Sequence, residues 1–314
     1  MKILKSDLNI NFNRYRKPAA ILSIILLIAS IASVVVHGLS FGLDFTGGAL
    51  LEVRYEQNAD TDLIRSQLEK EGFEQFDVKF FGTSKDVTIR LGPQGDREAS
   101  KIGNSVLAAL RSGSDSKVVM RRIEFVGPAV GDELAENGGT AMLVALIFIM
   151  IYVSIRFEWK FALGSVAALA HDVFITVGIF SILDIEFDLT VLAAILAVIG
   201  YSLNDTIVVF DRIRENFLKL RKSEPEKVVN SSLNQTLSRT LMTSITTLLV
   251  LVALFYLGGA LIHGFATALI IGVFVGTYSS IYVASNVALA LGITKEDLMP
   301  VEVEKEGADQ ESLL

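Results

Sequence analysis

Residues 18–36 read PAAILSIILLIASIASVVV, an uninterrupted apolar segment that decides the class of fold. A helix of about twenty apolar residues crosses the roughly 30 Å hydrocarbon core of a bilayer. The sequence HGLSFGLDF (37–45) that follows contains no Ala-x-Ala cleavage site. We therefore expect a retained anchor with a cytoplasmic amino terminus (1–17), because basic residues outnumber acids before it. These residues are Lys2, Lys5, Arg14, Arg16 and Lys17, against Asp7 alone.

Five more apolar segments follow the first one along the chain. With 51% hydrophobic residues and a mean hydropathy of +0.51, the 314-residue chain is too apolar for a soluble protein of this length. We expect an α-helical membrane protein with six transmembrane helices, because each segment is long enough to span a bilayer. The six expected helices cover about 18–36, 139–156, 161–183, 188–210, 240–257 and 264–291.

The loops between these segments differ in charge. The turn DIEFD (184–188) is acidic, whereas the turn after Arg156 and the predicted loop at about 211–239 are rich in Arg and Lys. Because basic loops stay in the cytoplasm, both termini are expected there and the stretch 37–138 is expected outside. The acidic residues 294–314 are then expected to form a cytoplasmic tail.

The stretch 37–138 has the mixed composition of a soluble domain. Alternating apolar residues predict a strand at 49–56, where Leu51, Val53 and Tyr55 share one face. Further patterns predict a helix at 61–71, strands at 76–81 and 86–91, a helix at 98–111 and a strand at 117–125. This order, β-α-β-β-α-β, predicts a ferredoxin-like α+β domain inserted between transmembrane helices 1 and 2.

Motifs of soluble enzymes are missing from the sequence. It contains no P-loop, no GxSxG, no HExxH and no dinucleotide fingerprint after a strand. It has no cysteine, and His37, His171 and His263 are not spaced as metal ligands. We therefore expect no enzymatic activity, no cofactor and no metal site.

An acidic residue lies inside the fourth apolar segment. Asp205, in GYSLNDTIVVFDRIREN (200–216), is expected about two helical turns from the cytoplasmic boundary. A charge at the bilayer centre costs at least about 2.5 to 3.5 kcal/mol, so such residues tend to have a function. Asp205 is thus a candidate for reversible protonation, with Ser202, Asn204 and Thr206 as polar neighbours. The alternative is an interfacial carboxylate that reaches cytoplasmic water.

Two other charged positions accompany Asp205. Arg239, in NQTLSRTLMTSITT (234–247), begins the next apolar segment and is expected in the same half of the membrane. It could form an ion pair with Asp205, or be an interfacial arginine of the basic loop. Asp172 follows His171 in the third segment, and this pair could relay protons or fix helix packing by a hydrogen bond.

Two patterns predict how helices pack. An i+4 repeat after Glu224-Pro225 predicts an amphipathic helix that runs along the membrane surface before it enters the membrane. The repeat consists of Val229, Leu233, Leu237 and Leu241. Gly272 and Gly276 form a small-x-x-x-small pair, which favours a close helix contact.

Five motifs in the same order as in a known family carry a resemblance over nearly the whole chain. The chain resembles the SecF family of protein-export membrane subunits, in the SecD/SecF group of the resistance-nodulation-division superfamily. The motifs are FGLDFTGG (41–48), FVGPAVGDEL (125–134), AHD (170–172), GYSLNDTIVVFDRIREN (200–216) and LSRTLMTS (237–244).

This resemblance implies a function and a set of partners. A SecF subunit pairs with SecD in the bacterial inner membrane and uses the proton motive force to promote the passage of unfolded polypeptide through the SecYEG channel. YajC is a further candidate partner, and the inserted domain is expected in the periplasm. Two alternatives stay open: half of a proton-driven exporter of small molecules or lipids, and a membrane scaffold that transports nothing.

The resemblance also implies roles for individual residues. Asp205 and Arg239 fall on the positions that take part in proton passage. Asp44, Gly47 and Gly48 fall on the link between the first helix and the outer domain, where they are expected to act as a hinge, because glycine permits turns that other residues resist. The alternative for these three is a plain turn at the entry of a strand.

Overall fold

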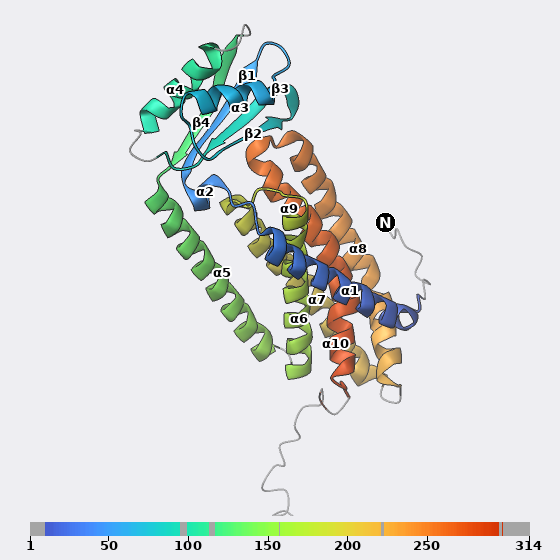
Figure 1. The fold of residues 1–314 in the computed structure, drawn as a ribbon. Coiled ribbons are helices and arrows are strands. Elements are labelled where there is room, and N and C mark those ends of the chain that lie inside the picture. The colour runs from blue at the N-terminus through green and yellow to red at the C-terminus, as the bar shows by residue number, and fades with distance from the viewer. Residues whose placement is uncertain are drawn as a thin grey trace, which may run out of the picture.

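The computed structural model describes residues 10–94, 99–112, 117–156, 158–220, 223–294 and 297. Within these residues, six helical spans are long and apolar enough to cross a membrane, as predicted. Figure 1 shows them as a bundle with a sheet domain at one end. The spans are α1 (Phe12–His37), α5 (Pro128–Arg156), α6 (Trp159–Ile182), α7 (Leu189–Lys219), α8 (Pro225–Leu257), and a sixth made of α9 (Ala260–Ser279), the π-helix η1 (Ser280–Ala284) and α10 (Ser285–Ala290).

Residues 1–9 and 298–314, which include most of the predicted tail, lie outside the described residues. Several described helices are longer than their apolar segments. α5 begins at Pro128, before the expected 139, because proline suits the first turn of a helix. The polar first turns of α5 therefore rise out of the bundle toward the sheet domain (Figure 1).

The expected loop at 211–239 is mostly helix. α7 continues to Lys219 and α8 begins at Pro225, so the connection is only a few residues long. The amphipathic helix predicted after Pro225 forms the first turns of the continuous α8. Val229 and Leu233 are buried in the same cluster as Ile213 and Phe217 of α7. The i+4 repeat therefore marks packing between two helices.

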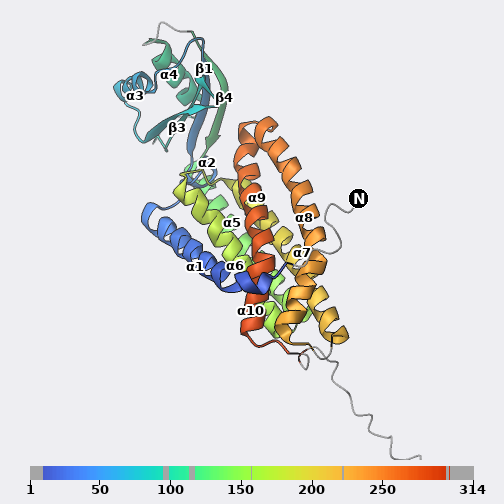
Figure 2. The same cartoon turned by 90° about the vertical axis from the view of Figure 1, so that its right-hand side faces the viewer.

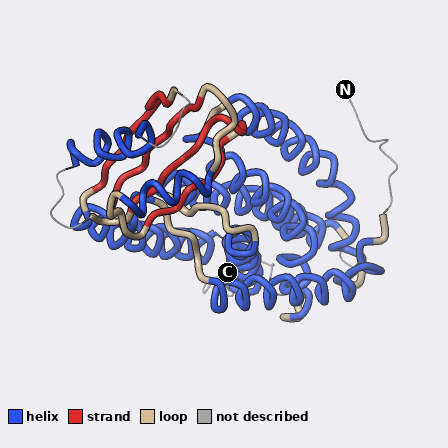
Figure 3. The backbone as a smooth tube through the Cα atoms, turned by 45° about the horizontal axis from the view of Figure 1, so that its top comes forward, coloured by secondary structure: helices blue, strands red, loops and turns tan. Residues whose placement is uncertain are grey.

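The sheet domain follows the predicted order of elements. Its four strands, β1 (Gly48–Tyr55), β2 (Phe76–Phe81), β3 (Thr83–Leu91) and β4 (Val118–Val126), form an antiparallel sheet in the order β2-β3-β1-β4. Helices α3 (Thr61–Lys70) and α4 (Ala99–Ser112) cover one face, as Figures 2 and 3 show. The core between them contains Leu51, Val53, Leu68 and Leu110, all buried. The ferredoxin-like α+β fold is therefore confirmed.

The other face of the sheet is polar and carries ion pairs. Arg54 donates two hydrogen bonds of 2.6 Å to Asp86 on the neighbouring strand. These bonds, with one from the Thr83 hydroxyl, hold the pKa of Asp86 down at about 2. On the covered face, burial raises the pKa of the Tyr55 phenol to about 12.

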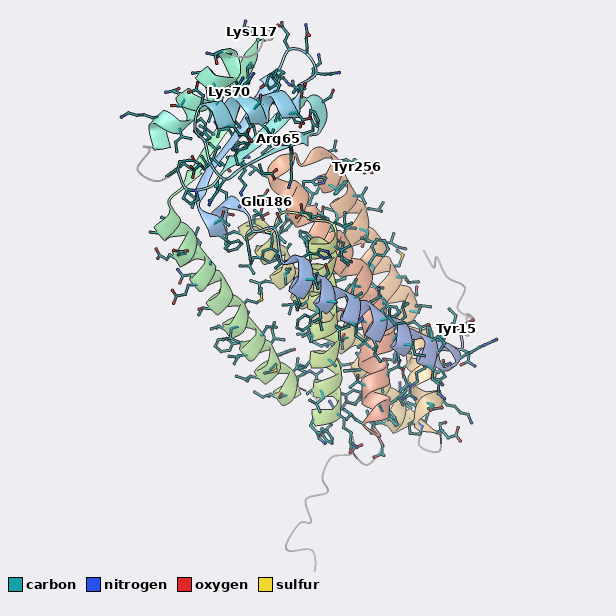
Figure 4. All side chains as sticks on the ribbon, in the orientation of Figure 1. Tyr15, Arg65, Lys70, Lys117, Glu186 and Tyr256 are labelled. Carbon is teal, nitrogen blue, oxygen red and sulfur yellow. The ribbon has the colours of Figure 1, made fainter. Side chains whose placement is uncertain are left out.

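The polar face of the sheet lies over the short loop between α6 and α7. Arg90 reaches Glu186 of that loop at 3.4 Å, and Lys79 reaches Asp184 at 3.7 Å. Figure 4 shows Glu186 between the sheet domain and the bundle. Burial raises the pKa of Glu186, and the positive charge of Arg90 opposes that effect. The sheet domain is therefore attached to the bundle by side chains as well as by its two chain connections.

Candidate functional site in the helix bundle

Asp205 lies on α7 inside the bundle, with only 8% of its surface exposed. The Thr240 hydroxyl of α8 donates to its Oδ1 at 2.7 Å, and the Ser280 hydroxyl of η1 donates to its Oδ2 at 2.5 Å. Three helical elements thus meet at one carboxyl group, and each oxygen accepts a hydrogen bond. Such bonds stabilise a carboxylate that is removed from water.

Asp172, on α6, is a second buried carboxyl group and is 1% exposed. Its Oδ1 lies 2.9 Å from Nδ1 of His171, whereas its Oδ2 accepts from Ser202 of α7 at 2.5 Å and from Ser279 of α9 at 2.7 Å. The Nε2 atom of His171 is buried and has no hydrogen-bond partner in the described part of the chain. Asp172 therefore joins three helices, like Asp205.

The two carboxyl groups are connected through adjacent residues. Ser279 ends α9 and binds Asp172, and Ser280 begins η1 and binds Asp205. A π-helical segment widens the helix locally, and such segments are frequent at functional sites. Because consecutive helical side chains point in different directions, this backbone presents one hydroxyl group to each carboxylate.

The sequence patterns did not single out Thr240, Ser279 or Ser280 as ligands of carboxylates. The signal present was weak: SSIYVAS (279–285) places three serines within an apolar helix. Serine and threonine are common in membrane helices, where they mostly bond to the backbone of their own helix. Only the packing of α7 against α8 and η1 shows which hydroxyl groups reach the carboxylates.

The other predicted neighbours of Asp205 have different surroundings. Ser202 donates to Asp172, Asn204 is exposed and Thr206 is buried. Arg239 precedes Thr240, in the same part of the bundle as predicted, but its side chain is exposed. Among the described residues it forms no ion pair, so its charge acts on Asp205 only through space.

The predicted hinge residues connect the sheet domain to the start of α7. Asp44, in the short helix α2 (Leu43–Thr46), accepts a hydrogen bond of 3.1 Å from the backbone N–H of Leu189. Gly47 and Gly48 have φ values of 66° and 118°, which favour glycine, and a Cβ at Gly48 would collide with the carbonyl oxygen of Leu91. These positions therefore join β1 to the helix that carries Asp205.

Gly272 and Gly276 allow the close contact that their spacing predicted. A Cβ at Gly272 would collide with Val198 of α7, and one at Gly276 would lie 3.1 Å from the Cβ of Ser202.

In the described residues, no group of three or more His, Cys, Asp or Glu side chains is placed to hold a metal ion. The buried polar side chains at this site carry carboxyl, hydroxyl and imidazole groups, all of which are able to exchange protons.

These features define a class: a multi-pass membrane protein with hydrogen-bonded carboxyl groups in its core and an α+β domain attached to the same helices. A family model described as protein export membrane protein SecD/SecF, C-terminal, matches residues 106–294. A second, the SecD/SecF GG motif, matches residues 32–59, which include Gly47 and Gly48. The chain belongs to the SecF family of protein translocase subunits.

Curated relatives match along almost the whole chain. The protein translocase subunit SecF of Vibrio alginolyticus is 57% identical over 308 residues, which cover 98% of each chain. That of Escherichia coli O157:H7 is 48% identical over 305 residues, covering 97% of this chain and 94% of the relative.

Two solved structures of SecDF resemble the chain. The crystal structure of SecDF from Thermus thermophilus, described as a translocon-associated membrane protein, has a TM-score of 0.83 at 39% identity and covers 92% of this chain. SecDF in a super-membrane-facing form has a TM-score of 0.67 at 40% identity and covers 91%. The chain spans only 39% of the length of each SecDF chain.

Proposed function

We propose that this chain, together with SecD, uses the proton motive force to promote the passage of unfolded polypeptide through the SecYEG channel. The single observation that carries the proposal is the buried Asp205, held by hydroxyl groups from two other helical elements. Such a group binds and releases a proton with a change in hydrogen bonding between helices. SecYEG and YajC enter as partners through family membership alone. The proposal assigns a transport role and no enzymatic activity.

The proposed location is the bacterial inner membrane, with both termini in the cytoplasm and the sheet domain in the periplasm. Basic residues at the end of the bundle opposite the sheet domain support this orientation, because positive charge is retained on the cytoplasmic side. Among the described residues, these include Arg156 and Lys160 beside the connection from α5 to α6. Arg212 and Lys219 lie near the end of α7.

A polar stripe on α8 supports direct packing with SecD. Arg239, Thr243 and Thr246 are exposed on this chain at helical spacing, and the apolar Leu249 continues the same helix. Polar side chains within a membrane span normally face protein or water. The six membrane helices of SecD, packed against this stripe, would cover it. The SecD subunit would then lie close to Asp205.

In the proposed mechanism, a proton neutralises Asp205. The carboxylate then no longer accepts strong hydrogen bonds from both Thr240 and Ser280, so the contact of α7 with α8 and η1 weakens. Arg239 would hold the deprotonated state by its charge, either through space or by an ion pair in another conformation. His171 and Asp172 would extend the proton path through Ser279.

The energy of proton movement favours two carboxyl groups over one. One charge that crosses 100 mV supplies about 2.3 kcal/mol, whereas a shift of a two-state equilibrium from 1:99 to 99:1 requires about 5.5 kcal/mol. Two protons supply about 4.6 kcal/mol from voltage alone. Asp205 and Asp172 together therefore come close to a full conformational switch, and a pH gradient would supply the remainder.

The start of α7 supports a connection between proton binding and the sheet domain. The backbone N–H of Leu189 donates a hydrogen bond to Asp44, which lies in the short helix α2 just before Gly47 and Gly48. A shift of α7 would thus act on the proposed hinge.

The test is proton-gradient-dependent export in membrane vesicles that contain this chain, SecD and SecYEG. Asp205→Asn removes the proton-binding group with little change in volume and is expected to abolish the part of export that depends on the gradient. Asp211→Asn is the matched control, because Asp211 lies on the same helix and binds Arg156 outside the site.

Unchanged gradient dependence in Asp205→Asn would contradict the proposal. If neutral variants of both Asp205 and Arg239 still support normal polypeptide export, the chain is better explained as a scaffold. If the vesicles expel a small molecule or a lipid in response to the gradient, the chain is better explained as half of an exporter.

A further inference from the structure

A cavity of about 640 Å³ lies at the end of the bundle opposite the sheet domain. It is formed by the first turns of α1, the start of α8 and the end of α10. Its polar lining consists of Asn13, Arg14, Arg16, Lys17, Glu226 and Asn286. Three cations therefore face one carboxylate. The proposed proton path does not use this cavity.

Hydrogen bonds between the helices build the cavity. Asn13 Nδ2 donates to the backbone oxygen of Glu226 at 3.0 Å, and Asn286 Nδ2 donates to that of Arg16 at 3.3 Å. Arg16 also binds the Glu226 carboxylate at 3.1 Å. The Glu226 carboxylate is thus already paired with Arg16. Hydrogen bonds also connect α1 to both α8 and α10.

Two cations of the cavity remain available for a ligand. Among the described residues, neither Arg14 nor Lys17 forms an ion pair, and both are exposed. A guanidinium and an ammonium group together favour a phosphate, which Arg binds with two parallel hydrogen bonds. The charge of the cavity is therefore complementary to a phosphate group.

The surroundings of the cavity identify the source of that phosphate. Pro18 and Ala20 line it, and Ile21, Ile24 and Ile25 continue along α1 as apolar side chains, each more than half exposed. Tyr15 is 51% exposed at the same end of α1, where Figure 4 shows it pointing away from the bundle. Tyrosine at this level is typical of the membrane interface. Acyl chains fit the apolar continuation, whereas a free phosphate would leave it unused.

We propose that this cavity binds the headgroup of an anionic phospholipid, with Arg14 and Lys17 on the phosphate and the acyl chains along α1. Basic pockets between membrane helices bind such headgroups. The lipid would connect α1 to α8, which carries Thr240, and to α10, which continues from η1.

Native mass spectrometry of the purified full chain tests the proposal, with phosphatidylglycerol and phosphatidylcholine added separately. We expect wild-type protein to retain phosphatidylglycerol in preference to phosphatidylcholine. The affinity of the double variant Arg14→Gln/Lys17→Gln for phosphatidylglycerol should be lower by roughly tenfold or more, because each basic residue near an anionic headgroup adds to the binding free energy. Its fold is checked by thermal unfolding and by its elution on size exclusion.

The matched control is Arg214→Gln/Lys219→Gln, which removes two exposed cations from the same end of the molecule but outside the cavity. This variant should bind phosphatidylglycerol as wild type does. Equal losses in the two double variants would mean general attraction to surface charge and would overturn the proposal. Absence of a lipid preference, or complete competition by millimolar inorganic phosphate, would also overturn it.

Discussion

At the residue scale, hydroxyl groups determine how the buried carboxylates are held. Asp205 and Asp172 could be recognised in the sequence, because an acidic residue within an apolar segment is conspicuous. Their partners Thr240, Ser279 and Ser280 could not, because the partnership depends on which helices pack together. The sequence left open whether Arg239 pairs with Asp205 or is an interfacial arginine. Among the described residues there is no such ion pair, and the neighbouring Thr240 donates a hydrogen bond to Asp205.

The Ser280 hydroxyl is predicted to be needed for proton-driven export. Ser280→Ala removes one of the two hydrogen bonds to Asp205, and a bond to a charged group contributes about 1.5 to 3 kcal/mol. We expect the gradient-dependent rate of export in vesicles to fall about tenfold. Ser285→Ala is the control, since Ser285 is buried nearby but bonds to a backbone oxygen. Equal rates in the two variants would argue against a role for the Ser280 side chain.

Asp86 is predicted to give the sheet domain an acid-sensitive contribution to stability. Its pKa in the folded chain is about 2, below the value of about 3.9 in unfolded chains, chiefly because Arg54 binds it. The contribution is therefore complete above pH 4 and is lost as the pH falls toward 2. Pulse proteolysis with pepsin across this range should show less acid sensitivity in Asp86→Asn than in wild type.

The control for this experiment is Asp62→Asn, because Asp62 pairs with Arg65 at a well-exposed position. It should retain the acid sensitivity of wild type. If Asp86→Asn retains it as well, the Arg54 contact does not stabilise the domain.

At the scale of the element, the six membrane spans and the strands β1 to β4 and helices α3 and α4 of the sheet domain were predictable, whereas α2, η1 and several boundaries were not. The i+4 repeat from Val229 to Leu237 suits a helix on a membrane surface and a helix packed on α7 equally well. The start of α5 at Pro128 could not be predicted, because its first turns are polar and so lie outside the apolar segment. The π-helix at Ser280 gives no sequence signal of its own.

The crossing of α7 and α9 is predicted to require Gly272. Gly272→Ala places a Cβ against Val198, and overpacking of this kind costs about 1 to 3 kcal/mol. Thermal unfolding of the purified protein should show a lower midpoint for this variant. Gly200→Ala, on α7, is the control, because nothing lies within 4 Å of an added Cβ there. A midpoint for Gly272→Ala as high as that of the control would contradict the close contact.

At the scale of the whole molecule, the proposed proton site and the sheet domain lie on one continuous set of contacts. α7 carries Asp205 at its middle and meets Asp44 at its start, while the loop before it binds the sheet through Glu186 and Arg90. The sequence predicted the six spans and the inserted domain, but the docking of the sheet on this loop depends on side chains far apart in the chain. The central claim is that proton binding at Asp205 moves the sheet domain.

The most direct measurement of that claim is a distance between the sheet domain and the bundle as the pH changes. The chain contains no cysteine, so Lys70→Cys on α3 and Tyr256→Cys on α8 provide two unique sites for spin labels, both exposed (Figure 4). In protein reconstituted with SecD, the distribution of label distances is predicted to shift on acidification. The same labels in Asp205→Asn should give one distribution at every pH. An equal pH-dependent shift with and without the Asp205 carboxyl group would contradict the account.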